Sequence, residues 1–356
     1  MSAPVPAHPV ELVVHMGTGK TGTSSIQELL HANGDRLMGR GILYPQTPGS
    51  RRHLGLTLFM QDADPHDVPT GRREFYRSQE AFEQRLVSEV DRAGVSRVVL
   101  SDEAVYASSA KALRRLRDLT DRLAHHVRLV VYLRRQDEHL VSRYQQVVKV
   151  GETRRLAERL CLDLSDTYDY YARLRKHQRI LEPDELVVRR FERAAFVDGS
   201  LYQDFLHAAR LDVLEGDLEP VEVQNESLDA ESVEFLRLLN LLRVERPDLA
   251  PAFAGNRRLV PSLEARSSGP VLTLSDQELD AFMAQWEESN RQVARELAED
   301  AGDPLFRSPR TVRVATTDQR LDPARLGHFV GVTGLPESIY QPLRALAERE
   351  ARGTAG

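Results

Sequence analysis

Cysteine is nearly missing from this chain of 356 residues, in which Cys161 is the single example. One cysteine excludes an internal disulfide and a cysteine-based metal cluster, and we interpret Cys161 as a small buried apolar residue. Lysine is also scarce. Only four lysines occur, at positions 20, 111, 149 and 176, and the other basic side chains are arginines. In such a chain, the lysine of the glycine-rich stretch, Lys20, indicates a role that needs a compact ammonium group and not a planar guanidinium.

Long apolar runs are missing too. None approaches the roughly 18 to 20 residues that a helix needs to cross a bilayer, and residues 1–9 contain no basic segment or long apolar core. We therefore expect no signal peptide, no stable membrane insertion and a cytoplasmic location. The formal net charge of −6 argues against a general nucleic-acid binder, since such domains are usually strongly basic.

Apolar strands alternate with helical patterns along the first half of the chain. Strands are expected at residues 11–16, 41–45, 96–100, 127–133 and 186–191. This alternation predicts an α/β fold with a central parallel sheet covered by helices on both faces. Helices dominate after residue 136 and predict a helical cap over the ligand edge of the sheet. We expect a flexible N-terminus at residues 1–9 and a single domain at 10–356, helix-rich from about residue 150 onward.

The most informative stretch is glycine-rich and reads H-M-G-T-G-K-T-G-T-S-S over residues 15–25, between a strand and an amphipathic helix. Glycines let the backbone turn sharply and approach a ligand closely. The amides of a first helical turn favour an anion, Lys20 adds a point charge, and the hydroxyl groups add donors. The stretch therefore predicts a phosphate or sulfate site made of Gly17, Gly19, Lys20, Thr21, Gly22, Thr23 and Ser24.

This stretch differs from the nucleotide-triphosphate pattern G-x-x-x-x-G-K-[ST]. Gly19-Lys20-Thr21 fits the end of that pattern, but Val14 stands where its first glycine belongs. K-T-G-T-S after a strand resembles the 5′-phosphosulfate loop of sulfotransferases that use 3′-phosphoadenosine 5′-phosphosulfate (PAPS). The resemblance implies a P-loop-like three-layer sandwich and sulfuryl transfer from PAPS to a hydroxyl or amine, with no metal.

A second segment supports the same resemblance. Arg134 ends the strand at 127–133, Ser142 follows eight residues later on the next helix, and Tyr144 comes two residues after that. Arginine binds a phosphate through two parallel hydrogen bonds, and a serine hydroxyl adds another. In sulfotransferases such an arginine and serine hold the 3′-phosphate of PAPS, which implies Arg134 and Ser142 here. Arg135 stays open as an alternative, because Arg135-Gln136 replaces the residues that usually follow the arginine.

The candidate general base lies elsewhere in the chain. The resemblance implies a histidine or a glutamate. We choose His53 first, because it opens a helix after the second strand, where related enzymes place a base, and because histidine titrates near neutral pH. Glu103, in Ser101-Asp102-Glu103 after the third strand, is the alternative. Lys20 is expected to neutralise charge on the bridging oxygen, and His15, inside the first strand, is expected to be structural.

Two other classes of function stay open. A P-loop kinase or other NTPase would use Lys20, Thr21 and Asp102 with ATP and magnesium, and a nucleotide-binding protein without catalysis would keep the loop alone. The combined motifs look most like bacterial PAPS-dependent sulfotransferases acting on a carbohydrate or small-molecule acceptor, with no nucleic-acid partner. Residues 190–192 and 225–227 are loosely expected on the nucleotide's side of the sheet.

Overall fold

The computed structural model describes residues 6–64, 66–68, 75–221, 227–253, 255–299, 302–311 and 314–353. The chain divides into two compact units. The first, the sheet unit, comprises residues 1–135, 164–223 and 286–308, and the second, the helical unit, comprises 136–163, 224–285 and 309–356. The expected single domain at residues 10–356, helix-rich from about residue 150 onward, stays a prediction.

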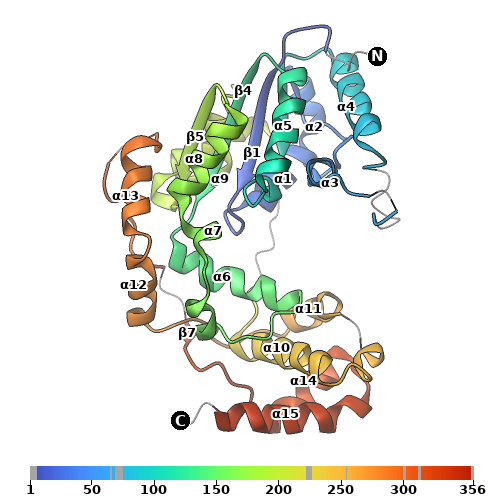
Figure 1. Ribbon diagram of the computed structural model, residues 1–356, viewed down its shortest axis with the longest axis vertical. Coiled ribbons are helices and arrows are strands. Elements are labelled where there is room, and N and C mark those ends of the chain that lie inside the picture. Colours follow the sequence, from blue (N-terminus) through green and yellow to red (C-terminus); the bar gives the residue numbers. More distant parts are fainter. Residues whose placement is uncertain are drawn as a thin grey trace. The chain divides into compact units, whose positions relative to one another are not determined.

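A five-stranded sheet forms the centre of the sheet unit (Figure 1). The strands are β1 (Glu11–Gly17), β2 (Ile42–Leu43), β3 (Arg97–Ser101), β4 (His126–Leu133) and β5 (Glu185–Arg190). Every neighbouring pair is parallel, in the order β2-β3-β1-β4-β5. The five expected strands and the α/β class are thereby confirmed. Residues of β1 are buried on both of its faces, which explains its nearly continuous apolar sequence.

Helices flank this sheet. The sheet unit contains α1 (Thr23–Ala32), α2 (Gly34–Met38), α3 (Leu54–Gln61), α4 (Gln79–Ala93), α5 (Ala110–Leu123), α7 (Ser165–Tyr168), α8 (Tyr170–Leu181), α9 (Leu201–Ala208) and α13 (Glu287–Glu296). Helices α1 and α9 share one buried cluster with Val13, Val130 and Tyr132 of the sheet. Helix α5 packs against α3 and α8, and α8 packs against α13; Figure 1 shows α5 and α8 lying across the strands.

The helical unit is built around one buried helix, α10 (Ala230–Glu245), which contacts α6 (Gln136–Lys149), α11 (Asn256–Glu264), α14 (Leu326–Thr333) and α15 (Tyr340–Gly353). It also contains α12 (Asp276–Ala284) and the short strand pair β6 (Val271–Leu272) and β7 (Ala315–Thr316). Helix α11 forms with Pro261 inside it, and its apolar residues Leu259, Val260 and Leu263 are buried.

Cys161 is exposed, which corrects its interpretation as a buried residue; it ends a short 3₁₀ turn, Ala157–Cys161, that has no buried residue. Within the expected flexible N-terminus, residues 1–5 lie outside the described part, whereas the His8 ring bonds the Val95 carbonyl at 2.7 Å. Of the helices that the structure describes, none has the length and apolarity to cross a membrane.

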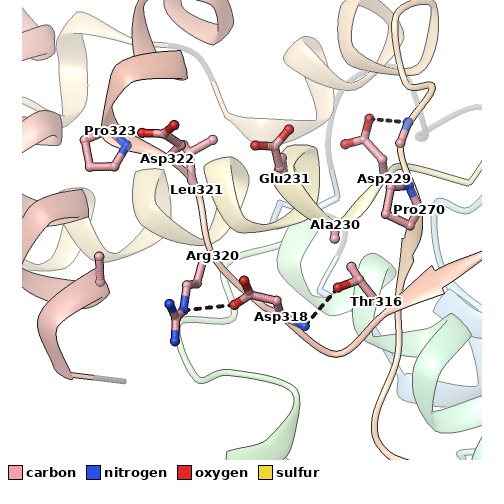
Figure 2. A pocket seen from close by; sticks show the side chains of 12 residues that line it. Asp229, Ala230, Glu231, Pro270, Thr316, Asp318, Arg320, Leu321, Asp322 and Pro323 are labelled. Atoms are coloured by element: carbon pink, nitrogen blue, oxygen red, sulfur yellow. Dashed lines mark hydrogen bonds and ion pairs between the residues drawn. The ribbon is translucent and has the colours of Figure 1, made fainter. Parts of the chain in front are cut away.

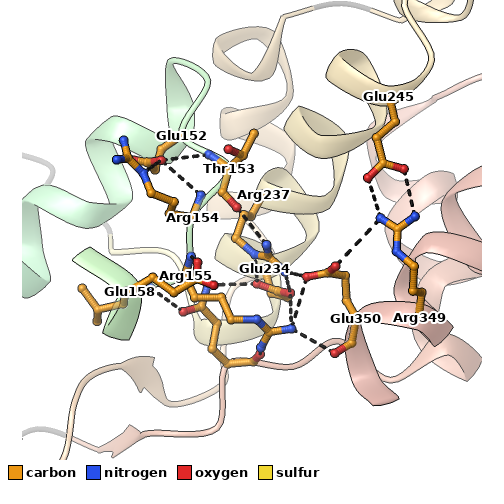
Figure 3. A network of polar contacts seen from close by, with 12 residues as sticks. Glu152, Thr153, Arg154, Arg155, Glu158, Glu234, Arg237, Glu245, Arg349 and Glu350 are labelled. Atoms are coloured by element: carbon orange, nitrogen blue, oxygen red, sulfur yellow. Dashed lines mark hydrogen bonds and ion pairs between the residues drawn. The ribbon is translucent and has the colours of Figure 1, made fainter. Parts of the chain in front are cut away.

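A buried charge network holds the helical unit together (Figure 3). The side chains of Arg237 and Glu234 are each 2% exposed, and Arg237 donates two hydrogen bonds to Glu234, at 2.8 and 2.6 Å. Arg237 also bonds Glu350 of α15 at 2.8 Å and the Thr153 carbonyl at 2.8 Å. Burial alone would lower the pKa of Arg237, but the bonds to Glu234 outweigh burial and raise it.

We expect Arg237→Met to lower the free energy of unfolding by about 3 to 5 kcal/mol, because it leaves the Glu234 carboxylate buried without its cation. Urea unfolding followed by circular dichroism measures the change. The matched control is Arg344→Met, which breaks an ion pair with Glu348 at 2.9 Å in which the arginine side chain is 50% exposed and should cost about 1 kcal/mol or less. Equal losses for the two variants would contradict this account of the network.

Candidate functional site

The glycine-rich loop joins β1 to α1 at the carboxyl edge of the sheet, and its backbone is unusual. Three residues have left-handed backbone conformations: Gly19 (φ 78°), Lys20 (φ 54°) and Gly22 (φ 73°). A non-glycine residue in this region is uncommon and is often found at functional sites. A side-chain carbon at Gly17 would lie 2.1 Å from Thr23 Oγ1, and one at Gly22 would lie 2.3 Å from Leu201 Cδ2. Both positions therefore require glycine.

Two threonine hydroxyl groups of this loop fit an anionic ligand. Thr21 and Thr23 are buried, and among the described residues neither Oγ1 atom has a hydrogen-bond partner. A buried hydroxyl without a partner costs free energy. Together with the amides at the start of α1, these hydroxyls can donate to the oxygen atoms of a phosphate or sulfate group. The chemistry of the loop therefore matches the anion site that the sequence predicts.

Arg134 lies beside the same loop. Its Nη1 donates to the Lys20 carbonyl at 3.0 Å, its guanidinium carbon lies 5.8 Å from the centre of the Phe191 ring, and its own carbonyl accepts from the Tyr170 hydroxyl at 2.6 Å. Arg135 instead donates to the Ser308 carbonyl at 3.3 Å. Arg134 thus contacts the glycine-rich loop. Phe191 also lies against Gly22, so the loosely expected residues 190–192 share this edge.

The partner expected for Arg134 lies in the other unit. Ser142 belongs to α6 of the helical unit, whereas Arg134 belongs to the sheet unit, so a shared phosphate contact stays a prediction. Tyr144 has a structural role within the helical unit: its buried hydroxyl donates to the Arg154 carbonyl at 2.9 Å and accepts from Gln319 at 2.6 Å. Residues 225 and 226 lie outside the described part of the chain.

His53, the first choice for the base, is fully buried at the start of α3. Its Nδ1 accepts a hydrogen bond from the Ser101 amide at 3.0 Å, its own amide donates to the Ser101 carbonyl at 3.3 Å, and its ring stacks on Tyr44 with centres 4.2 Å apart. Burial lowers the pKa of His53 to about 3, although the Pro45 carbonyl acts in the opposite direction. A lone pair already bonded to the backbone is poorly placed to take a proton, so the geometry does not favour the predicted role.

His15 shares the same buried polar cluster. Its Nδ1 lies 2.9 Å from Ser101 Oγ, and Gln27 of α1 donates to Ser101 O at 3.1 Å and to its Oγ at 3.2 Å. Burial lowers the pKa of His15 to about 3. The ring packs against Phe205 with centres 5.0 Å apart. These contacts agree with the structural role that the sequence suggests for His15.

The acidic residues after β3 have different surroundings. Asp102 is fully buried, and it accepts from Arg52 at 3.2 and 3.0 Å, from the Ala104 amide at 3.0 Å and from the Thr57 hydroxyl. Glu103, in the 3₁₀ turn η2 (Glu103–Val105), is partly exposed and lies 3.4 Å from Arg52. Sequence reasoning missed Arg52 and Thr57 because neither belongs to a motif and both reach Asp102 from about 50 residues away in the chain.

The helical unit contains a separate pocket of about 390 Å³ at the start of α10 (Figure 2). Its acidic residues have partners: Asp318 pairs with Arg320 at 2.9 Å, and Asp229 accepts from the Gly269 amide at 3.3 Å. None of the residues predicted from the sequence to bind nucleotide or act in catalysis lines this pocket. The candidate site is therefore the glycine-rich loop with its neighbours at the carboxyl edge of the sheet.

No family model matches the chain. An uncharacterised protein of Archaeoglobus fulgidus is 30% identical over 171 residues, and the match spans 48% of this chain and 45% of that protein. Among solved structures, a sulfotransferase from Alicyclobacillus acidocaldarius is similar with a TM-score of 0.37 and 17% identity, over 68% of this chain and 94% of that chain.

His15 and His53, two of the buried histidines, predict how the free energy of unfolding depends on pH. Each has a pKa of about 3 in the folded protein against an ordinary 6.5, so folding favours the neutral ring. The stabilisation is complete above pH 6.5 and is lost as pH falls from 6.5 toward 3, by about 1.4 kcal/mol per pH unit for each ring. Urea unfolding across this range should show a shallower pH dependence for His15→Asn than for the original protein. Substituting the exposed His207 is the control, and parallel curves for H15N and the original protein would contradict the prediction.

Proposed function

We propose that this protein is a PAPS-dependent sulfotransferase, which transfers the sulfuryl group to a hydroxyl or amine of a carbohydrate or small-molecule acceptor. One observation carries the proposal: two buried threonine hydroxyls without partners among the described residues lie in a loop that Arg134 also contacts. The arrangement suits a nucleotide that presents anionic groups to the loop. The departure of the loop from the triphosphate pattern supports PAPS rather than ATP.

In this proposal the residues of the loop from Gly17 to Ser24 hold the 5′-phosphosulfate through hydroxyl groups and the first amides of α1. The acceptor oxygen or nitrogen forms a bond to sulfur in line with the bridging oxygen, whose bond to sulfur breaks. The released electron pair stays on the phosphate of adenosine 3′,5′-bisphosphate, where Lys20 neutralises the charge. The acceptor's proton passes to the general base. Arg134 binds the 3′-phosphate.

Glu103 is the better candidate for that base. Its carboxylate is partly exposed and lies just after the end of β3, the strand that pairs with β1 and so ends beside the glycine-rich loop. His53, by contrast, is buried and its Nδ1 is bonded to the Ser101 amide. A base must reach the acceptor's proton within hydrogen-bond distance or through one water. We therefore assign this role to Glu103.

The alternative, a kinase or other NTPase, needs a carboxylate to hold magnesium near the loop. Asp102 is the residue that the sequence offers for this task. Its two carboxylate oxygens already accept hydrogen bonds from Arg52, Thr57 and the Ala104 amide. Metal binding at Asp102 would have to break these bonds inside a buried site, which favours the sulfotransferase proposal.

Isothermal titration calorimetry tests the proposed co-substrate. Adenosine 3′,5′-bisphosphate should bind in the presence of EDTA, and Arg134→Ala should weaken binding by roughly 10- to 100-fold, because a charge-assisted hydrogen bond to phosphate contributes about 1.5 to 3 kcal/mol. Arg36→Ala, which removes an exposed arginine paired with Glu219, should leave the affinity unchanged. Tight binding of magnesium–ATP without a response to the 3′-phosphate would refute the proposal.

Two substitutions distinguish the candidate bases. In His53→Asn the amide oxygen can accept the Ser101 hydrogen bond in place of Nδ1, so sulfuryl transfer should change only a few-fold. Glu103→Gln removes the base and should lower the rate by about 10² to 10⁴. Transfer of labelled sulfate from PAPS is measured over a panel of carbohydrate, phenolic and lipid acceptors. If H53N alone abolished turnover while nucleotide affinity stayed intact, the base would be His53.

A further inference from the structure

Arg52 connects a buried carboxylate with an exposed one. Its Nε and Nη2 donate to Asp102 Oδ1 at 3.2 and 3.0 Å, and its Nη1 lies 3.4 Å from Glu103 Oε1. The Asp102 side chain is 0% exposed, whereas those of Arg52 and Glu103 are each 41% exposed. The edge of the guanidinium formed by Nε and Nη2 is therefore fixed by a buried carboxylate. Its remaining amino group, Nη1, contacts the carboxylate that we assign as the base.

The backbone on both sides of Arg52 is also held in place. Gly49 (φ 128°) allows the Arg52 carbonyl to approach so closely that a side-chain carbon at Gly49 would lie 2.4 Å from it. The Tyr44 hydroxyl donates to the Arg51 carbonyl at 2.6 Å. On the other side, His53 exchanges two hydrogen bonds with Ser101, one residue before Asp102. The loop that carries Arg52 is thus joined to the end of β3, where Asp102 and Glu103 follow.

We propose that Arg52 is a positioning residue that holds the Glu103 carboxylate toward the acceptor, and that His53 acts by fixing the loop that carries Arg52. This inference rests on the proposed function. A partly exposed glutamate has several rotatable bonds and must lose that freedom before it can act as a base. Asp102 already fixes the orientation of the Arg52 guanidinium. Because planar Arg–carboxylate pairs have defined geometry, this guanidinium restricts the Glu103 side chain before the acceptor binds.

The charges of the three residues fit this role. Arg52, Asp102 and Glu103 together carry a net charge of −1, so one guanidinium does not neutralise both carboxylates. Because the Arg52 guanidinium contacts these two carboxylates, Arg52 should act on turnover through Glu103 and leave nucleotide binding unaffected. A small displacement of a reacting group can cost about 100-fold in rate, which sets the scale of the expected effect.

A double-mutant cycle on sulfuryl transfer tests the inference. Arg52→Gln should lower kcat by roughly 10- to 100-fold without changing the KM for PAPS, and Arg52→Lys should recover part of the loss. In the Glu103→Gln background, adding R52Q should change kcat by less than about twofold. Multiplicative losses would overturn the inference, because Arg52 would then act without Glu103; so would an E103Q variant with unchanged kcat.

Arg51→Ala is the matched control, because Arg51 is the adjacent arginine and pairs with Glu28 of α1 at 2.6 Å, with its side chain 65% exposed. It should leave kcat unchanged. Thermal unfolding shows whether each Arg52 variant is folded, and R52K keeps a cation beside Asp102 if R52Q does not fold.

A crystal structure of the folded variant gives a readout that does not depend on activity. In R52Q, or in R52K if R52Q does not fold, the Glu103 carboxylate should leave its present position, and an unmoved carboxylate would overturn the inference. If the original protein failed to bind adenosine 3′,5′-bisphosphate by calorimetry, the proposed function would fail instead. The two failures are therefore distinguishable.

Discussion

The geometry of the candidate site depends on a set of buried hydrogen bonds around Ser101, the last residue of β3. Its hydroxyl lies 2.9 Å from His15 Nδ1 of β1, and its amide donates to His53 Nδ1. Its hydroxyl and carbonyl both accept from Gln27 of α1. These bonds join β1, α1 and the loop that precedes α3. Each contributes about 1 kcal/mol when made, but a buried partner left unpaired costs about 1 to 3 kcal/mol, so the three segments are held in one arrangement.

This cluster lies directly before the residues with proposed chemistry. His15 precedes Gly17, where the glycine-rich loop begins, and Ser101 precedes Asp102 and Glu103. Both rings must stay neutral, since burial lowers the pKa of each to about 3, and a proton on either would disturb the contacts that hold the loop and the carboxylates. The two histidines thus have a structural role beneath the site. The roles that we propose in binding and chemistry belong to lysine, arginine and glutamate side chains.

Much of this arrangement could be predicted from the sequence, because it depends on local patterns. Periodicity located the five strands, and the parallel sheet then placed the glycine-rich loop and Arg134 at one edge. The contacts that decide roles are long-range and could not be predicted: nothing local shows that His53 bonds Ser101, that Arg52 reaches Asp102, or that α11 forms around Pro261. Histidine at a helix start indicates a base only if it is exposed, and exposure depends on Tyr44 and Ser101, which the sequence does not bring together.

Asp102 shows how tertiary contacts decide between two chemistries that one sequence allows. An apolar strand that ends in Asp-Glu beside a glycine-rich loop is compatible with a magnesium ligand or with an acidic group near an acceptor. In this protein the charge of Asp102 is balanced by Arg52, a cation of the chain itself, at 3.0 Å. A magnesium ion would have to displace that guanidinium and the Thr57 hydroxyl from a buried carboxylate, with a desolvation cost that its own attraction must exceed. Glu103, the next residue, keeps its carboxylate partly exposed, and for this reason we propose Glu103, and not Asp102, as the reactive carboxylate at this edge of the sheet.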